Sequence, residues 1–245
     1  MGKTFTVDLL HAQYLGSVKA FAKYLVWYLL LSGVWGQLGN KDMEVQTAIF
    51  ALSRELVAWY RERHRSRRGE QLTRVKNFGK HFVGVPSAQK LNTKGAESWG
   101  FLLFLVDCMK GKRDRLGPEA GQLMEAGDAL IALIELINSC GPRVEAAQID
   151  QAFFYWKKCC LLTEGCEELL QPKRHLILHL LDQLCEKGNP RAYANWLDEG
   201  LNRLLRSACR QLSQDNFEAA LLINMEELLK SAPTGKIKRQ RVREG

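Results

Sequence analysis

The sequence KRHLILHLLDQLCEKGNPRAYANWLDEGLNRLL, residues 173–205, predicts two helices joined by a sharp break. His175 and His179 lie one turn apart on the first helix, because residues four apart share a helix face. The other face of this helix carries three leucines, Leu176, Leu180 and Leu184. Gly188-Asn189-Pro190 then ends the helix, because Gly and Asn tolerate a left-handed cap and Pro cannot continue a helix.

The second helix of this stretch displays acidic and amide groups beside the two histidines. Spacings of three and four place Glu199, Asn202 and Arg203 on one side of it, clear of its leucines, and Asp198 precedes them. Glu199 and Arg203 also form an ordinary i,i+4 pair, which contributes about 0.3–0.5 kcal/mol on an exposed helix. These polar residues either form a functional site or are simply the solvated face of the helix, and the sequence is consistent with both interpretations.

Apolar periodicity predicts helices along most of the remaining chain, over residues 12–31, 42–63, 118–138, 144–168 and 215–229. The nearly continuous apolar run at 98–109 must be buried. The run at 24–31 also predicts a buried helix, and no membrane segment, because a bilayer span needs about 20 residues. A brief alternation at 4–10 allows one short N-terminal strand. We therefore predict a mostly α, multi-helix globular bundle.

The domain organisation follows from where the pattern breaks. We predict a single helical domain over residues 1–232, with a sub-boundary left open in the basic, glycine-broken stretch 64–94. Residues 233–245 are predicted to be a disordered basic tail.

Charge is distributed unevenly along the chain. Residues 54–94 hold 11 Lys and Arg against 3 Asp and Glu, and the tail from residue 230 holds 6 against 1. Residues 116–170 have the opposite balance, with 3 against 9. Two basic regions flanking an acidic one indicate a polyanionic partner, most simply nucleic acid, while a solvated surface patch is the alternative.

The basic belt, which we define as the cations from Arg61 to Lys80, supplies the main candidate phosphate contacts. Arginine offers fork-shaped donors to phosphate oxygens, although cations also suit the C-terminal end of a helix dipole. The candidate nucleic-acid-binding residues are Arg61, Arg63, Arg65, Arg67, Arg68, Arg74, Lys76 and Lys80, with Lys238, Arg239 and Arg241 in the tail.

Seven cysteines, with no signal peptide before them, indicate reduced thiols in the nucleus or cytoplasm of a protein that is not secreted. No C-x-x-C pair occurs, so the usual zinc framework is missing. His175, His179 and Cys185 make an alternative zinc set that needs a fourth ligand from elsewhere. Buried free cysteines are the other interpretation, because Cys packs as a small hydrophobe.

Two segments together resemble a known family. Val7-Asp8-Leu9-Leu10-His11, followed by Tyr14-Leu15-Gly16, is similar to the D-x-x-H … L-G box of hAT, CACTA and KDZ cut-and-paste transposases. In those families the Asp ends a strand of an RNase H-like core, and a helical insertion separates it from the helix with the last catalytic acid. In this chain, the stretch 173–205 corresponds to the segment that carries the last catalytic acid in those families.

The resemblance implies a set of site residues. Asp8 would be the second ligand and Glu199 the third ligand of a Mg²⁺ pair that performs phosphoryl transfer, with Asp198 as a rival to Glu199. His11 and Asn202 would support them. The first catalytic Asp of these families lies on an earlier strand, and only seven residues precede Asp8 here. We therefore expect a portion of such a transposase that does not cleave DNA by itself.

Three functions are consistent with these patterns. The first is a transposase-derived DNA-binding protein, whose oligomeric state, including a homo-oligomer, the sequence leaves open. The second is an RNA-binding, nucleoprotein-like packaging protein, in which aromatic side chains among the basic residues stack on bases. The third is an intact Mg²⁺-dependent nuclease. The stacking candidates of the second are Tyr60, Phe78 and Phe82.

Overall fold

The computed structural model describes residues 6–87, 91–195, 222, 223 and 226. The chain divides into two compact units, residues 1–194 and 195–245, and the single domain 1–232 stays a prediction. The following description concerns the first unit. In the second, Leu222, Ile223 and Glu226 are helical and fall within the predicted helix 215–229.

The described part of the chain is helical and contains no strand. Its α-helices are α1 (Lys19–Leu31), α2 (Lys41–Ser66), α3 (Lys80–Val83), α4 (Gly95–Gly111), α5 (Ala120–Ser139), α6 (Ala146–Leu162), α7 (Pro172–Asp182) and α8 (Leu184–Lys187). A π-helix, η1 (Leu10–Val18), leads directly into α1. Single 3₁₀ turns lie at η2 (Arg113–Arg115), η3 (Glu167–Leu169) and η4 (Pro190–Ala192). The mostly α bundle predicted from the sequence is thus confirmed.

The short N-terminal strand expected at 4–10 is not formed over its described residues, 6–10. From Thr6 to Asp8 the backbone has no regular structure, and the chain is helical from Leu9 onward. The alternation that suggested a strand is misleading because Leu9, Leu10 and Ala12 are all buried, as the inner face of a helix requires.

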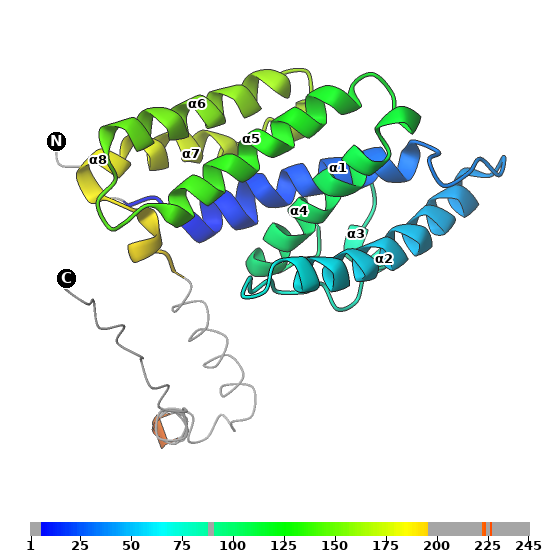
Figure 1. Ribbon diagram of the computed structural model, residues 1–245, viewed down its shortest axis with the longest axis horizontal. Helices are drawn as coiled ribbons and strands as arrows, with labels where there is room; N and C mark the ends of the chain where they lie inside the picture. Colours follow the sequence, from blue (N-terminus) through cyan, green and yellow to red (C-terminus); the bar gives the residue numbers. More distant parts are fainter. Residues whose placement is uncertain (1–5, 88–90, 196–221, 224–225, 227–245) are drawn as a thin grey trace. The chain divides into compact units, whose positions relative to one another are not determined.

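The core of the first unit is organised around α1 and α4, which pack on each other and on η1. The apolar run at 98–109 forms most of α4 and is almost completely buried, as predicted. Helices α5 and α6 lie side by side as an antiparallel pair (Figure 1). A Cβ atom at Gly127 of α5 would lie 2.5 Å from Val106 Cγ2 of α4, so glycine allows these two helices to approach closely.

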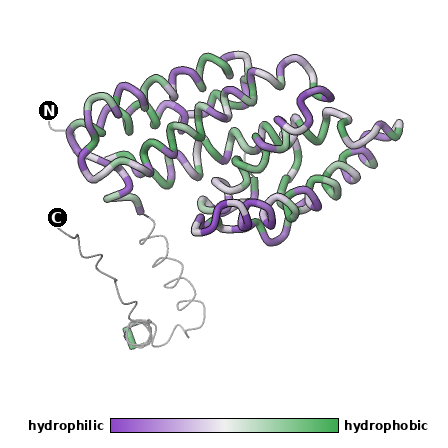
Figure 2. The backbone as a smooth tube through the Cα atoms, in the orientation of Figure 1, coloured by the Kyte–Doolittle hydropathy of each residue, from purple (hydrophilic) through white to green (hydrophobic). Residues whose placement is uncertain are grey.

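Helix α2 packs on α1 through one apolar face, and its other face is mixed, with exposed Met43, Phe50 and Val57 among polar residues (Figure 2). Asn40 caps its start by accepting hydrogen bonds from the N–H groups of Asp42 and Met43. The buried residues of α2 are Ala48, Ile49, Leu52, Leu56 and Tyr60. The basic stretch that follows is loop-rich, as predicted, yet Phe82, Val83 and Leu91 within it are buried in the same core.

Among the residues that the structure describes, no helix is both long enough and apolar enough to cross a membrane. Helix α1, which contains the strongest apolar run, instead buries Phe21, Leu25, Val26 and Leu29 inside the protein.

Candidate functional site

Asp8 caps the helix that follows it. Its Oδ2 atom accepts a hydrogen bond from the His11 backbone N–H at 3.0 Å, and its backbone oxygen accepts one from Ala12. The His11 Nδ1 atom contacts the same carboxylate oxygen. The Asp8 side chain is only 16% exposed, and a carboxylate is favoured at a helix N-terminus because the unpaired N–H groups there carry positive partial charge. The D-x-x-H spacing therefore has a local structural explanation.

The structure brings the D-x-x-H segment together with the first helix of the stretch 173–205, whose described part ends at residue 195. The backbone N–H of Val7 donates to the side-chain oxygen of Gln183 at 3.0 Å, and Lys187 Nζ donates to the Thr6 hydroxyl at 3.1 Å. At the other end of this contact, a Cβ atom on Gly16 would lie 3.2 Å from Lys173 Cβ. Helix α7 thus packs antiparallel along η1, and both ends of the contact involve residues of the two motif segments.

The Gly188-Asn189-Pro190 break caps the end of α5. The buried Asn189 side chain donates to the backbone oxygens of Ile137 and Cys140, each at 2.9 Å. Gly188 has φ +74°, and a Cβ atom there would lie 2.4 Å from the Pro142 oxygen. The expected left-handed glycine is confirmed, and the reason for this sequence is the close approach to the carbonyl groups at the end of α5.

Helix α7 also caps α6. Arg174 donates to the Cys160 oxygen at 3.1 Å and to the Thr163 hydroxyl at 2.6 Å, where a cation suits a helix C-terminus. The face of α7 that packs on the core holds Ile177, Leu180 and Leu181, whereas Leu176 is 38% exposed. The predicted leucine face is therefore wrong at Leu176, because the helix is rotated so that Ile177 points inward.

The two histidines of α7 are exposed and contact each other edge to face, with ring centroids 4.5 Å apart. Cys185 is exposed on the following turn. In the described part of the chain, no group of three His, Cys, Asp or Glu side chains is arranged to hold a metal ion. The predicted acids Glu199 and Asp198, with Asn202, lie outside the described residues, so the Mg²⁺ set Asp8–Glu199 stays a prediction.

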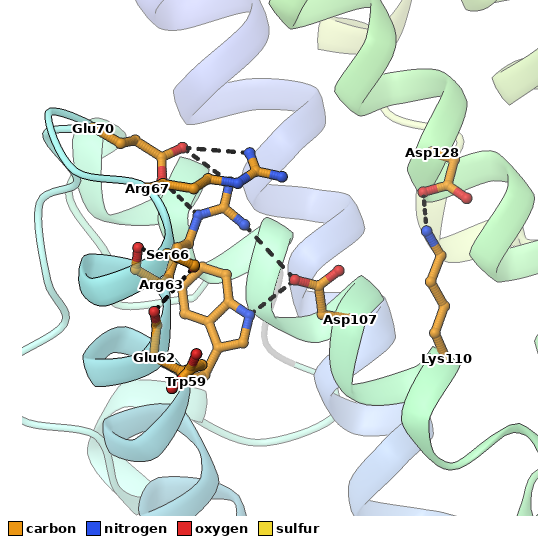
Figure 3. A network of polar contacts seen from close by, with 9 residues as sticks. All are labelled: Trp59, Glu62, Arg63, Ser66, Arg67, Glu70, Asp107, Lys110 and Asp128. Atoms are coloured by element: carbon orange, nitrogen blue, oxygen red, sulfur yellow. Dashed lines mark hydrogen bonds and ion pairs between the residues drawn. The ribbon is translucent and has the colours of Figure 1, made fainter.

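The basic belt contains one arginine with a structural role. Arg63 is only 10% exposed, and it donates from Nε and from an Nη atom to the two carboxylate oxygens of Glu70 at 2.6 and 2.9 Å (Figure 3). Its guanidinium lies 4.9 Å from the Trp59 ring centroid and 3.7 Å from Asp107. Two of its nitrogen atoms already donate to Glu70 within the protein, so the guanidinium is mainly engaged there, and phosphate contact by Arg63 stays a prediction.

Asp107 takes part in the same network. It accepts a hydrogen bond from Trp59 Nε1 at 2.9 Å, and this contact joins α4 to the C-terminal part of α2 (Figure 3). Arg67 lies 3.9 Å from Glu70 on the solvent side of the network. Hydrogen bonding from Arg63 is the main reason that the pKa of Glu70 lies below its ordinary value.

The other cations of the belt are exposed. Arg65 lies 3.8 Å from Glu62, but both side chains are more than 70% exposed, so this pair contributes little. Five cations have no carboxylate within 4 Å in the described structure: Arg61, Arg68, Arg74, Lys76 and Lys80. Lys238, Arg239 and Arg241 of the predicted tail lie outside the described residues.

The predicted base-stacking residues belong to the core. Tyr60 and Phe82 are each 6% exposed, and Phe78 packs against Phe82 and Phe101 with ring centroids 5.2 and 5.6 Å away. The Tyr60 oxygen accepts a hydrogen bond from the Val75 N–H. Tyr60 and Phe82 cannot stack on nucleic-acid bases without leaving the core, whereas Phe78 is half-buried against it.

A second feature was not predicted from the sequence. A cleft with a volume of about 1060 Å³ runs along α1 and is closed on the other side by η3 and the start of α7. Lys23, only 7% exposed, lines this cleft. The signal in the sequence is Lys23, the one lysine of the apolar run AFAKYLVWYLLL (residues 20–31), because lysine is rarely buried unless it is paired.

No protein-family model, curated protein or solved structure matches this chain. The family resemblance therefore rests on the two motif segments alone.

Proposed function

We propose that this chain is a transposase-derived protein that binds DNA through its basic belt, in the nucleus or cytoplasm, without cleaving it. The observation that carries the proposal is the group of five exposed cations without a carboxylate partner, which extends from the last turns of α2 to the start of α3. Cations that are not neutralised within the protein can release counterions from phosphates when DNA binds.

The internal pairing of Glu70 strengthens this surface. Glu62 and Glu70 are the two carboxylates between residues 61 and 80, and Glu70 is held by Arg63. A phosphate backbone that approaches the belt therefore meets mainly positive charge. Backbone contacts of this kind position a duplex without reading its sequence, so we expect binding that tolerates sequence changes.

The derivation from a transposase is supported by the contact between the D-x-x-H segment and α7. Val7 and Gln183, which lie in the two motif segments, are joined by a hydrogen bond across 176 positions of sequence. Such a contact is what the family resemblance implies for two segments of one functional unit. The RNA-packaging alternative receives less support, because Tyr60 and Phe82 are buried.

The test is the salt dependence of binding to a 30-base-pair duplex of arbitrary sequence, measured by fluorescence anisotropy. In the wild type, the logarithm of the binding constant should fall linearly with the logarithm of the salt concentration, with a slope of about −0.9 for each phosphate contacted. Replacing four exposed belt residues by Gln should flatten that slope by about 3–4 and weaken binding at low salt by at least about 10-fold. The four residues are Arg61, Arg68, Lys76 and Lys80, which are exposed and have no carboxylate partner in the described structure.

The matched control removes the same charge from other exposed positions, Lys41, Arg113, Arg143 and Lys157. An equal loss of affinity in the two quadruple variants would overturn the role of the belt. Tighter binding of single-stranded RNA than of duplex DNA would favour the packaging alternative. Mg²⁺-dependent nicking of a supercoiled plasmid that Asp8→Asn abolishes would overturn the expectation that the chain does not cleave DNA.

A further inference from the structure

The cleft along α1 has the size of a ligand site. Its volume of about 1060 Å³ lies just above the range of roughly 300–1,000 Å³ that is usual for small-molecule pockets. All of its lining residues belong to the first unit of the chain. None of them belongs to the basic belt, so the cleft is separate from the surface proposed to bind DNA.

One wall of the cleft is built from three aromatic residues of α1, Tyr24, Trp27 and Tyr28. Their polar atoms have partners within the protein. Trp27 Nε1 donates to the Val83 oxygen at 3.3 Å, and the hydroxyls of Tyr24 and Tyr28 lie beside Cys166 and Gly117. Leu31 and Leu170, each 62% exposed, extend the apolar surface. This wall therefore offers a ligand mainly apolar and aromatic contact.

Lys23 is the exceptional group in this cleft. It is 93% buried relative to an exposed lysine, and no hydrogen bond or ion pair to another described residue engages it. Burial lowers the pKa of Lys23, because desolvation disfavours its charged form. Lys173, the other lysine of the cleft, already has an interaction within the protein. A single cationic group is thus left for a ligand.

The opposite wall limits the charge that a ligand can carry. Glu167 and Glu168 are exposed there, and Glu119 lies close enough to Tyr28 to raise the pKa of that hydroxyl, after the larger effect of burial. These carboxylates repel a chain of phosphates, so a nucleic-acid strand is disfavoured. A ligand with one negative charge can reach Lys23 while its apolar part lies against the aromatic wall.

We propose that this cleft binds a small amphipathic carboxylic acid, whose carboxylate pairs with Lys23 and whose apolar body lies along Tyr24, Trp27 and Tyr28. The pairing gives the Lys23 ammonium, which has no partner among the described residues, an oppositely charged one. The apolar contact supplies most of the remaining affinity, because it removes nonpolar surface from water. The proposal is independent of DNA binding.

The experiment is displacement of a fluorescent aromatic anion, 8-anilinonaphthalene-1-sulfonate, from the full chain. Dodecanoate should displace the probe at a concentration about 10- to 100-fold lower than 1-dodecanol, because only the acid forms a charge-assisted hydrogen bond. Lys23→Met should remove this preference, whereas Lys158→Met, a control on the exposed side of α6, should retain it.

A second variant keeps the test decisive if Lys23→Met folds poorly. Glu167→Gln combined with Glu168→Gln changes only exposed side chains and should tighten dodecanoate binding about 2- to 5-fold by removing repulsion. Equal displacement by dodecanoate and 1-dodecanol in the wild type would overturn the proposal. Displacement by adenosine monophosphate at lower concentration than by dodecanoate would also overturn it, because the ligand would then be a nucleotide.

Discussion

The backbone N–H of Val7 donates a hydrogen bond to the side-chain oxygen of Gln183 at 3.0 Å, and this contact holds the N-terminal segment on the end of α7. Gln183 is 7% exposed, so the bond is shielded from water. Because buried backbone groups are almost always paired, Gln183 has a structural role as the acceptor for the Val7 N–H. This role does not depend on any function of the neighbouring Asp8 and His11.

Gln183→Leu should lower the free energy of unfolding by about 1–3 kcal/mol, because it leaves the Val7 N–H without its acceptor while it keeps the side-chain volume. Urea unfolding followed by circular dichroism measures the change. The control is Gln151→Leu, at an exposed position of α6, where we expect a change below about 0.5 kcal/mol. Similar effects of the two substitutions would show that the Val7 contact contributes nothing.

Gly16→Ala tests the packing of α7 on η1. The added methyl group would lie 3.0 Å from the His11 oxygen and 3.2 Å from Lys173 Cβ, so backbone or side chain must shift at a cost of about 1–3 kcal/mol. Gly121→Ala in α5 is the matched control, because nothing lies within 4 Å of its added methyl group. We expect it to stabilise the protein by about 0.5–1 kcal/mol. The midpoint temperature of thermal unfolding, compared with that of the wild type, should fall for Gly16→Ala and rise for Gly121→Ala.

The sequence predicts the elements that apolar periodicity controls and misses the features that depend on tertiary contacts. The burial of 98–109 follows from its composition, and the left-handed Gly188 follows from Gly-Asn-Pro, without knowledge of the partner at Pro142. The sequence of α7 is equally consistent with a buried face that contains Leu176 and with one that contains Ile177. Only the contacts of α7 with its neighbours show that Ile177 is the buried residue.

In the candidate site, too, some features could be predicted from the sequence and others depend on tertiary contacts. All eight cations of the belt look alike in sequence, and only the loop that returns Glu70 to α2 separates Arg63 from the others. The cleft beside Lys23 could not be predicted, because it depends on the position of η3 and α7 against α1. Residues such as Glu199 lie outside the described part of the chain.

Arg63→Gln should destabilise the protein, whereas Arg61→Gln should not. Arg63 makes two charge-assisted hydrogen bonds to Glu70 from a 10% exposed position, and their loss should cost about 1–3 kcal/mol. Arg61 is exposed, so its substitution should change the free energy of unfolding by less than about 0.5 kcal/mol. Urea unfolding of both variants would contradict the structural role of Arg63 if their midpoints agreed.

The pairing of Glu70 predicts a dependence of stability on pH. Hydrogen bonding from Arg63 holds the pKa of Glu70 below its ordinary value of 4.5. A carboxyl group whose pKa is depressed in the folded state contributes stability above the pKa of the unfolded chain, and that contribution is lost as pH falls through the folded pKa. We expect Glu70→Gln to lose less stability than the wild type between about pH 5 and pH 3. Parallel pH profiles of the two proteins would contradict this expectation.

Thiol labelling in the native state should follow burial. Cys185 is exposed, whereas Cys108 and Cys159 are buried, and desolvation raises the pKa of each of these two thiols to about 12. Since the thiolate is the reactive species, we expect a maleimide at pH 7 to modify Cys185 at least about 100-fold faster than Cys108 or Cys159. Peptide mapping by mass spectrometry after short exposure measures the order. In urea the difference should disappear, because unfolding exposes all three thiols, and early labelling of Cys108 in the native protein would contradict its place in the core.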